Sequence, residues 1–131
     1  LLSKRINLAN NYESKLRNVE GITLTHFSKK ETCASCTCDS KQCKHSYQTF
    51  SIFVEDRDRI MTEMRNKGIE VQIGTYSLHM HTAFQNNPLV EIKGDMKNSL
   101  WCYKHALALP LYNDLTIELQ QRVIEELKKS L

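Results

Sequence analysis

The stretch RDRIMTEMRNKGIEVQIGTYSLH, residues 57–79, carries the pattern that decides the fold. Ile60, Met61 and Met64 recur at helical spacing and predict a helix whose apolar face they form. Gly68 follows this helical pattern, as is typical just beyond the C-terminus of a helix. The hydrophobic period changes after Gly68, so the stretch predicts a helix followed directly by a different element.

That following element is a predicted strand, because Ile69, Val71 and Ile73 alternate with polar residues. Upstream of the helix, residues 47–54 are rich in aromatic and β-branched residues and predict a second strand. Asp56 lies between this strand and the helix, where its carboxylate is placed to cap the helix N-terminus. The stretch therefore predicts a strand, helix, strand unit.

The rest of the chain supplies further predicted elements around this unit. The N-terminal segment has apolar residues at helical spacing, and Thr116 is placed to cap a last amphipathic helix. Residues 22–27 predict a strand, residues 96–105 a helix and residues 106–111 a short strand. Pro110 cannot donate a backbone hydrogen bond, so we expect that short strand at an edge of the sheet.

These elements predict one domain over residues 1–131, of class α/β (α+β). The simplest arrangement is a two-layer sandwich, with a small mixed or antiparallel sheet covered by helices on one face. We do not expect an all-parallel sheet, because no crossover helix separates residues 22–27 from residues 47–54. Residues 75–94 have no clear period, and a long irregular segment inside a compact domain is more often functional than idle.

The composition is that of an ordinary soluble globular protein, with 40% hydrophobic residues, 25% charged residues and a net charge of +3. The basic residues alternate with acidic ones, so we expect no nucleic-acid partner. No apolar run reaches the ~20 residues of a membrane span, and no secretory leader is evident, so we expect no membrane partner and a cytoplasmic location. A helical pattern is already under way at Leu1, which leads us to expect a fragment of a longer protein.

A cysteine-rich loop insert is predicted at residues 28–44. Four cysteines follow the pattern C-x2-C-x-C-x4-C; they are Cys33, Cys36, Cys38 and Cys43. Four thiolates at this spacing can bind one tetrahedral Zn²⁺, which would order the loop and leave no open position for catalysis. The competing interpretations are a surface loop with free thiols, and redox or iron–sulfur chemistry, although the spacing matches no common iron–sulfur pattern.

Three stretches resemble, in their order and spacing, a known enzyme family. They read HSYQTF at residues 45–50, RDRI with KGIEVQIGTY and LH between residues 57 and 79, and ALPLY with LT and VI between residues 108 and 124. Together they resemble the C-terminal part of the DegT/DnrJ/StrS family of PLP-dependent sugar aminotransferases. The resemblance covers nearly the whole chain, except for the cysteine-rich loop.

The resemblance implies that this chain is the small C-terminal domain of a fold-type-I aminotransferase. A missing N-terminal domain would hold pyridoxal phosphate (PLP) through a lysine. The full-length enzyme would move an amino group, commonly from glutamate, to a nucleotide-linked keto-sugar, and family members are typically homodimers. We find no candidate catalytic or cofactor-binding residue in this chain, so the isolated domain is expected to be inactive.

The resemblance also implies four substrate-binding residues, which are His45, Tyr47, Tyr76 and His79. Aromatic rings stack on bases and sugar rings, and imidazoles donate hydrogen bonds to phosphates and hydroxyls. The residues alone leave other interpretations open: Tyr47 as a core residue, His45 as a metal ligand or solvated residue, and His79 in packing or paired with His81 on a metal.

One residue of the motif departs from the family pattern. Ser77 stands where the family usually has proline, so we expect the loop after Tyr76 to bend differently.

A different class of function also remains open, in which the chain is a stand-alone, zinc-stabilised binding module built around the cysteine cluster.

Overall fold

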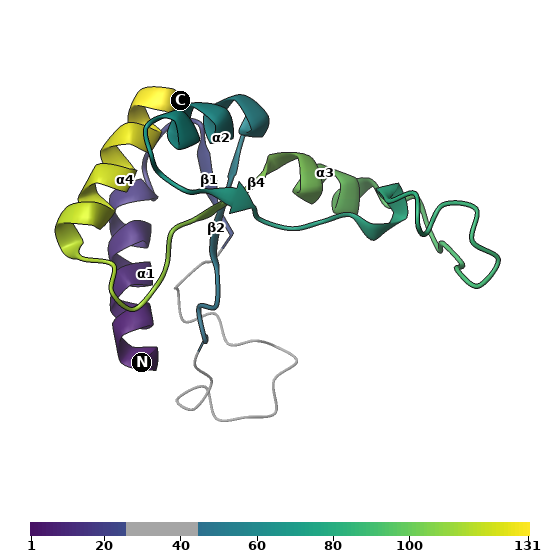
Figure 1. Ribbon diagram of the computed structural model, residues 1–131, viewed down its shortest axis with the longest axis horizontal. Coiled ribbons are helices and arrows are strands. Elements are labelled where there is room, and N and C mark those ends of the chain that lie inside the picture. Colours follow the sequence, from purple (N-terminus) through teal and green to yellow (C-terminus); the bar gives the residue numbers. More distant parts are fainter. Residues whose placement is uncertain (26–44) are drawn as a thin grey trace.

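Four strands form one antiparallel sheet within residues 1–25 and 45–131, the part of the chain that the computed structural model describes (Figure 1). The sheet order is β1-β2-β4-β3, and each neighbouring pair is antiparallel. The strands are β1 (Ile22–Leu24), β2 (Phe50–Val54), β3 (Gln72–Ile73) and β4 (Ala106–Leu109). The expectation of a small sheet with antiparallel pairing is therefore confirmed.

Three helices gather on one side of this sheet and enclose the core (Figure 1). They are α1 (Leu2–Leu16), α2 (Arg57–Asn66) and α4 (Ile117–Ser130). Alternate residues of β2, namely Phe50, Ile52 and Val54, are buried and join the core cluster. The ring of Tyr12 on α1 stacks on Phe50 with 5.1 Å between the ring centroids. Helices over one face of the sheet give the predicted two-layer arrangement.

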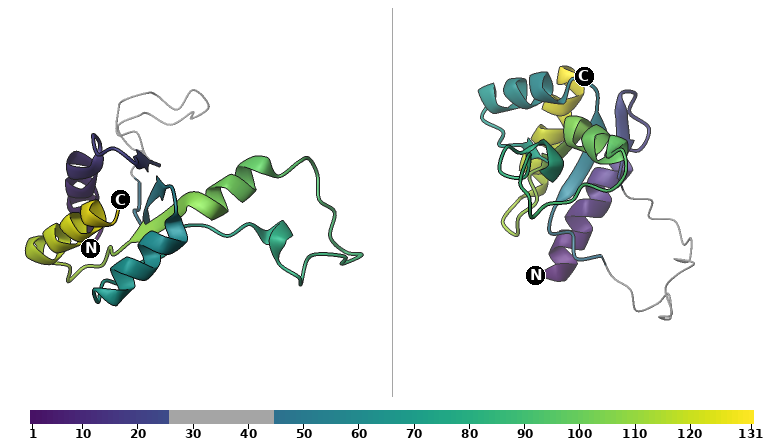
Figure 2. Two further views of the ribbon diagram at one scale, coloured as in Figure 1. Left: turned by 90° about the horizontal axis from the view of Figure 1, so that it is seen from above. Right: turned by 90° about the vertical axis from the view of Figure 1, so that its right-hand side faces the viewer.

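The fourth helix, α3 (Lys97–His105), runs directly into β4 and lies apart from the other three. Trp101 on α3 packs against Phe53 of β2, with 4.7 Å between ring centroids, and Phe53 points to the face of the sheet opposite the core. The segment from Gly74 to Met96, which includes the short 3-10 helix η1 (Leu78–Met80), extends with α3 away from the body (Figures 1 and 2). We call residues 74–96 the arm.

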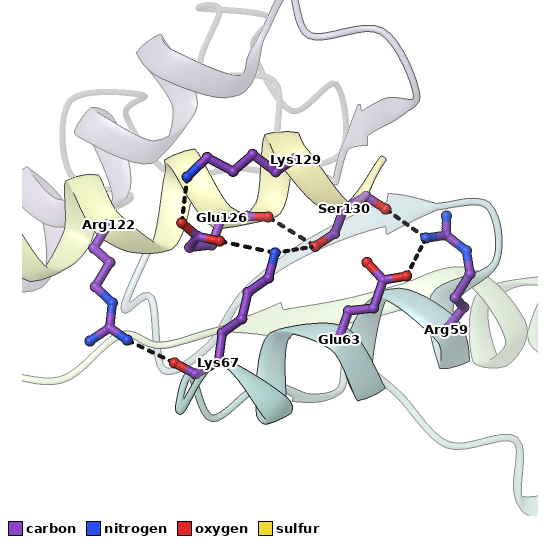
Figure 3. Close-up of polar contacts among 7 residues, drawn as sticks. All are labelled: Arg59, Glu63, Lys67, Arg122, Glu126, Lys129 and Ser130. Atoms are coloured by element: carbon purple, nitrogen blue, oxygen red, sulfur yellow. Dashed lines mark hydrogen bonds and ion pairs between the residues drawn. The ribbon is translucent and has the colours of Figure 1, made fainter.

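A polar seam joins α2 and the residue that follows it to the C-terminal part of α4 (Figure 3). The carboxylate of Glu126 contacts Lys67 Nζ at 2.9 Å and Lys129 Nζ at 2.7 Å. Arg59 donates to the backbone carbonyl of Ser130 at 2.9 Å. The hydrogen bonds from Lys129 and then Lys67 lower the pKa of Glu126 to about 2. The seam therefore keeps Glu126 ionised at acidic pH values where an unpaired glutamate is protonated.

The short strand after α3 is central, so the expectation of an edge position is wrong. β4 pairs with β2 on one side and with β3 on the other. It ends at Leu109, so Pro110 falls just outside the hydrogen-bonded ladder and its missing N–H costs nothing there. Pro110 instead accepts a hydrogen bond from the hydroxyl of Tyr12 through its carbonyl, at 2.9 Å.

Two other local expectations differ in outcome. The Thr116 cap is confirmed, because its side chain accepts a hydrogen bond from the backbone N–H of Leu119 at 3.2 Å. Asp56 precedes α2 as expected, but its side chain makes no capping hydrogen bond, and its backbone is left-handed at φ 44°.

The strand expected after α2 is reduced to Gln72–Ile73. Residues 28–44, including the four cysteines, lie outside the described residues.

Candidate functional site

Tyr76 lies at the base of the arm, where the chain leaves β3. Its side chain is 55% exposed, and its ring contacts those of Tyr103 and His81, with centroids 6.1 Å and 5.8 Å away. Tyr103 is itself backed by the guanidinium of Arg57, 5.5 Å above its ring. Tyr76 therefore presents an open aromatic face from a supported position.

The Arg57 side chain is a feature that sequence analysis passed over. It is buried, its Nε lies 2.6 Å from a carboxylate oxygen of Asp58, and its Nη1 donates to the carbonyl of Ala106 at 3.4 Å. Among the described residues, Arg57 Nε has no hydrogen-bond partner, and Asp58 is its neighbour on the same helix. The contacts with the Ala106 carbonyl and the Tyr103 ring are therefore the ones that join α2 to β4 and α3. The motif Arg-Asp at residues 57–58 was the available signal, but the pattern alone suggests only a solvated helix start.

His79 lies on η1, three residues after Tyr76. Its Nδ1 is 2.9 Å from the hydroxyl oxygen of Ser77, which in turn is 2.9 Å from the hydroxyl oxygen of Ser99 on α3. Ser77 is 1% exposed. Its backbone φ of −103° lies outside the range near −65° that a proline requires. This backbone conformation does not suit a proline, and the expected difference from the family's loop stays a prediction.

His45 and Tyr47 form a second pair, in the segment that enters β2. The backbone N–H of Tyr47 donates to His45 Nδ1 at 2.9 Å, and the two ring centroids are 4.3 Å apart. Tyr47 is 9% exposed and belongs to the core cluster, whereas His45 is exposed. Burial, and then the nearby Glu13 carboxylate, raise the pKa of Tyr47. This pair thus combines a packed phenol with an accessible imidazole.

The structure places these two pairs at opposite ends of the sheet. β2 and β3 both run antiparallel to β4, so they run in the same direction. His45 and Tyr47 precede β2, while Tyr76 and His79 follow β3. The four residues therefore do not converge on one point within a single chain.

A groove of about 660 Å³ lies at the same end of the sheet as the segment entering β2. Gln48 and Thr49 line it, together with apolar side chains around the end of β4 and the start of α4. Ile69, Leu111, Leu115 and Leu119 contribute to these walls, and none of the four predicted substrate-binding residues does. The groove has no concentration of charge that would select one kind of ligand.

No metal or cofactor cradle is found within the described ranges 1–25 and 45–131. These ranges contain no group of three or more His, Cys, Asp or Glu side chains able to hold a metal ion. Every lysine there is at least partly exposed, whereas a lysine that forms a Schiff base with PLP needs a desolvated amine. The residues of this part of the chain therefore do not fit PLP. In the same ranges, no helix combines the length and apolar character needed to cross a membrane.

Comparison with known proteins agrees with this fold. A sequence model of the DegT/DnrJ/EryC1/StrS aminotransferase family matches residues 1–128. An uncharacterised protein of Methanocaldococcus jannaschii, MJ1066, is 24% identical over 132 residues, which cover 96% of this chain and 31% of that protein. The chain therefore spans about a third of this relative's length.

Solved aminotransferases have the same fold over this region. The aminotransferase TlmJ from Streptoalloteichus hindustanus superposes with a TM-score of 0.78 at 18% identity, covering 98% of this chain and 31% of TlmJ. PseC from Helicobacter pylori, an aminotransferase involved in pseudoaminic acid biosynthesis, gives 0.79 at 18% identity, covering 99% and 32%. The PLP form of the putative sugar aminotransferase Spr1654 from Streptococcus pneumoniae gives 0.76 at 23% identity, covering 99% and 31%.

The family match extends over nearly the whole chain, and the architecture of the described residues is the one that these aminotransferases have. This chain belongs to the DegT/DnrJ/EryC1/StrS aminotransferase family.

Proposed function

We propose that this chain is the substrate-side C-terminal domain of a PLP-dependent sugar-nucleotide aminotransferase. The observation that carries the proposal is a family match over residues 1–128 in a chain about a third as long as its relatives. PLP, held by an N-terminal domain, would supply the electron sink for moving the amino group, with glutamate as the donor and a nucleotide-linked keto-sugar as the acceptor. The domain alone is inactive, because its described lysines offer no anchor for that cofactor. The full-length enzyme acts in the cytoplasm.

The role of this domain is to hold and orient the substrate. Tyr76 offers an exposed aromatic face to a base or sugar ring, and His79 offers an imidazole to a phosphate or hydroxyl oxygen. Holding the acceptor sugar at a fixed distance from the amine lowers the entropic part of the barrier. The exposed apolar side chains of the arm, such as Leu78 and Leu89, support the idea that another part of the enzyme covers it.

The placement of the two residue pairs supports a homodimer. His45 and Tyr47 lie at one end of the sheet, and Tyr76 and His79 at the other. A dimer can bring the arm of one subunit next to the segment entering β2 of its partner, so that both pairs face one substrate. Each pair then contributes to the same cleft from a different subunit.

The test is kinetic and uses the full-length enzyme encoded by the gene. Replacing Tyr76 by alanine removes a stacking surface worth about 1 kcal/mol, so KM for the nucleotide keto-sugar rises about fivefold. Thr82→Ala, at an exposed polar side chain on the same arm, is the matched control. Absence of any PLP-dependent transamination by the full-length enzyme would refute the proposal. An unchanged KM for Tyr76→Ala would refute the role of that residue.

The cysteine cluster carries a second proposal, argued from its sequence spacing. Cys33, Cys36, Cys38 and Cys43 bind one structural Zn²⁺, in the aminotransferase or in a stand-alone binding module. Metal analysis of protein purified under reducing conditions should give about one zinc per chain. Serine substitution of all four cysteines should remove it. A zinc content close to zero in the unsubstituted protein would end this proposal.

A further inference from the structure

The serine pair behind His79 has no role in the function proposed so far. Ser77 precedes η1 at the position of a helix N-cap, where a serine hydroxyl normally accepts a hydrogen bond from a backbone N–H. Here its side chain makes no capping bond, although its backbone carbonyl accepts from Met80 N–H at 3.0 Å. The hydroxyl of Ser77 is directed instead to His79 and Ser99, each 2.9 Å away.

Burial of the Ser77 side chain limits its hydroxyl to hydrogen-bond partners within the protein. A hydroxyl that is almost wholly removed from water must satisfy its hydrogen bonds within the protein, and Ser77 has two partners at short distance. Ser99 belongs to α3, so the chain of hydroxyls also ties η1 to that helix. The imidazole of His79 is thereby connected to α3 as well as to its own segment.

The direction of the two hydrogen bonds decides which nitrogen of His79 carries the proton. A serine hydroxyl has one proton and donates to one neighbour at a time. Two directions satisfy both hydroxyls: from Nδ1–H to Ser77 to Ser99, or from Ser99 to Ser77 to Nδ1. The second is favoured because it gives the buried Ser77 hydroxyl the stronger acceptor, an unprotonated imidazole nitrogen in place of the hydroxyl oxygen of Ser99. A neutral imidazole that accepts at Nδ1 keeps its proton on Nε2. Nε2 has no hydrogen-bond partner among the residues that the structure describes, so it is available to a ligand.

We propose that Ser77, supported by Ser99, is a positioning residue that holds neutral His79 as its Nε2–H tautomer. The imidazole then presents an N–H donor to an acceptor oxygen, either a phosphate or a sugar hydroxyl of the substrate. This inference rests on the proposed function for the role of His79 at the substrate. The tautomer itself is a property of this chain and does not depend on that role.

The first experiment measures the tautomer directly. Long-range 1H–15N correlation spectra of the labelled chain, recorded at about pH 8.5 where histidines are neutral, report which nitrogen is protonated. We expect His79 to be protonated on Nε2. Ser77→Ala should change its tautomer ratio and ring nitrogen shifts, and Ser99→Ala should move them less in the same direction. Ser14→Ala, at an exposed serine, is the matched control and should leave the His79 signals unchanged.

Two results would overturn the inference. One is protonation of His79 on Nδ1 in the unsubstituted chain, and the other is a His79 spectrum that does not respond to Ser77→Ala. Should Ser77→Ala fail to fold, the unsubstituted chain and Ser99→Ala still decide the question. His81, two residues further along the arm, serves as an internal reference imidazole.

Kinetics of the full-length enzyme separate this inference from the proposed function. His79→Ala should raise KM for the nucleotide keto-sugar about fivefold, which corresponds to about 1 kcal/mol, with little change in kcat. Ser77→Ala should raise KM less, and adding it to His79→Ala should have no further effect, because both act through one imidazole. Additive effects would contradict positioning by Ser77. A normal KM for His79→Ala, with the tautomer locked as expected, would refute the substrate role and leave the serine pair standing.

Discussion

Gly74→Ala tests how the arm is joined to the sheet. Gly74 is the first residue after β3, and its N–H donates to the carbonyl of Ala106 at 2.9 Å. A Cβ at this position would lie 2.8 Å from Ala106 Cβ and 3.1 Å from both the Ala106 carbonyl carbon and the Ser51 hydroxyl oxygen. No positive φ is involved, so the expected effect comes from steric overlap alone.

The size of the effect follows from these distances. Non-bonded carbons approach to about 3.5–4.0 Å, so the new methyl overlaps Ala106 by more than half an ångström. Its neighbours include backbone of the central strand, which cannot move aside as a flexible side chain would. Overpacking of this kind costs about 1–3 kcal/mol. For a chain of this length we expect the midpoint of thermal unfolding to fall by about 3–5 °C for each kcal/mol.

Chemical and thermal unfolding measure this loss, and a double-mutant cycle assigns its cause. Ala106→Gly removes the closest contact, so Gly74→Ala should cost less in that background than in the unsubstituted chain. Gly94→Ala is the comparison, because no atom lies within 4 Å of its Cβ position and its cost comes from a positive φ of 86°. Its effect should be the same with and without Ala106→Gly. An unfolding midpoint for Gly74→Ala equal to that of the unsubstituted chain would refute the close approach.

Two further predictions concern the body of the domain. Tyr12→Phe should lower the free energy of unfolding by about 1–2 kcal/mol in urea titrations, because the half-buried carbonyl of Pro110 loses its donor; no loss would mean that this carbonyl finds another partner. Glu126→Gln should destabilise the chain at neutral pH. Because folding lowers the pKa of Glu126 from 4.5 to about 2, its contribution is present above pH 4.5 and disappears as the pH falls toward 2. The difference in free energy of unfolding between the unsubstituted chain and Glu126→Gln should therefore shrink to zero over that pH range. A difference that does not depend on pH would contradict the lowered pKa of Glu126.

Local sequence patterns predicted α2 and α4 well, because each has its own apolar period and a signal at one end. The end of α2 at Gly68 and the cap of α4 at Thr116 are examples. Strand order is not encoded locally, so the position of β4 was misjudged from Pro110. A proline one residue beyond a central strand and a proline inside an edge strand look alike in sequence.

The candidate site was predictable as a set of residue types but not as an arrangement. An exposed Tyr76 at the start of an aperiodic segment agrees with the sequence pattern. The separation of this residue from His45 follows from the pairing of β2 and β3 with β4, which no local pattern reveals. The contact between Ser77 and Ser99 joins elements more than twenty positions apart, so it too becomes visible only in the folded chain.

The central position of β4 has a consequence for how the chain is made. Among the residues that the structure describes, β3 pairs with β4 alone, and β2 gains its second neighbour from β4. When the ribosome has synthesised the chain only through β3, β2 still lacks one of its two neighbouring strands and β3 lacks its partner. Pairings between distant segments are slow to form, and unpaired strand edges favour aggregation while they persist. The emergence of residues 106–109 is the step at which the nascent chain can close its sheet.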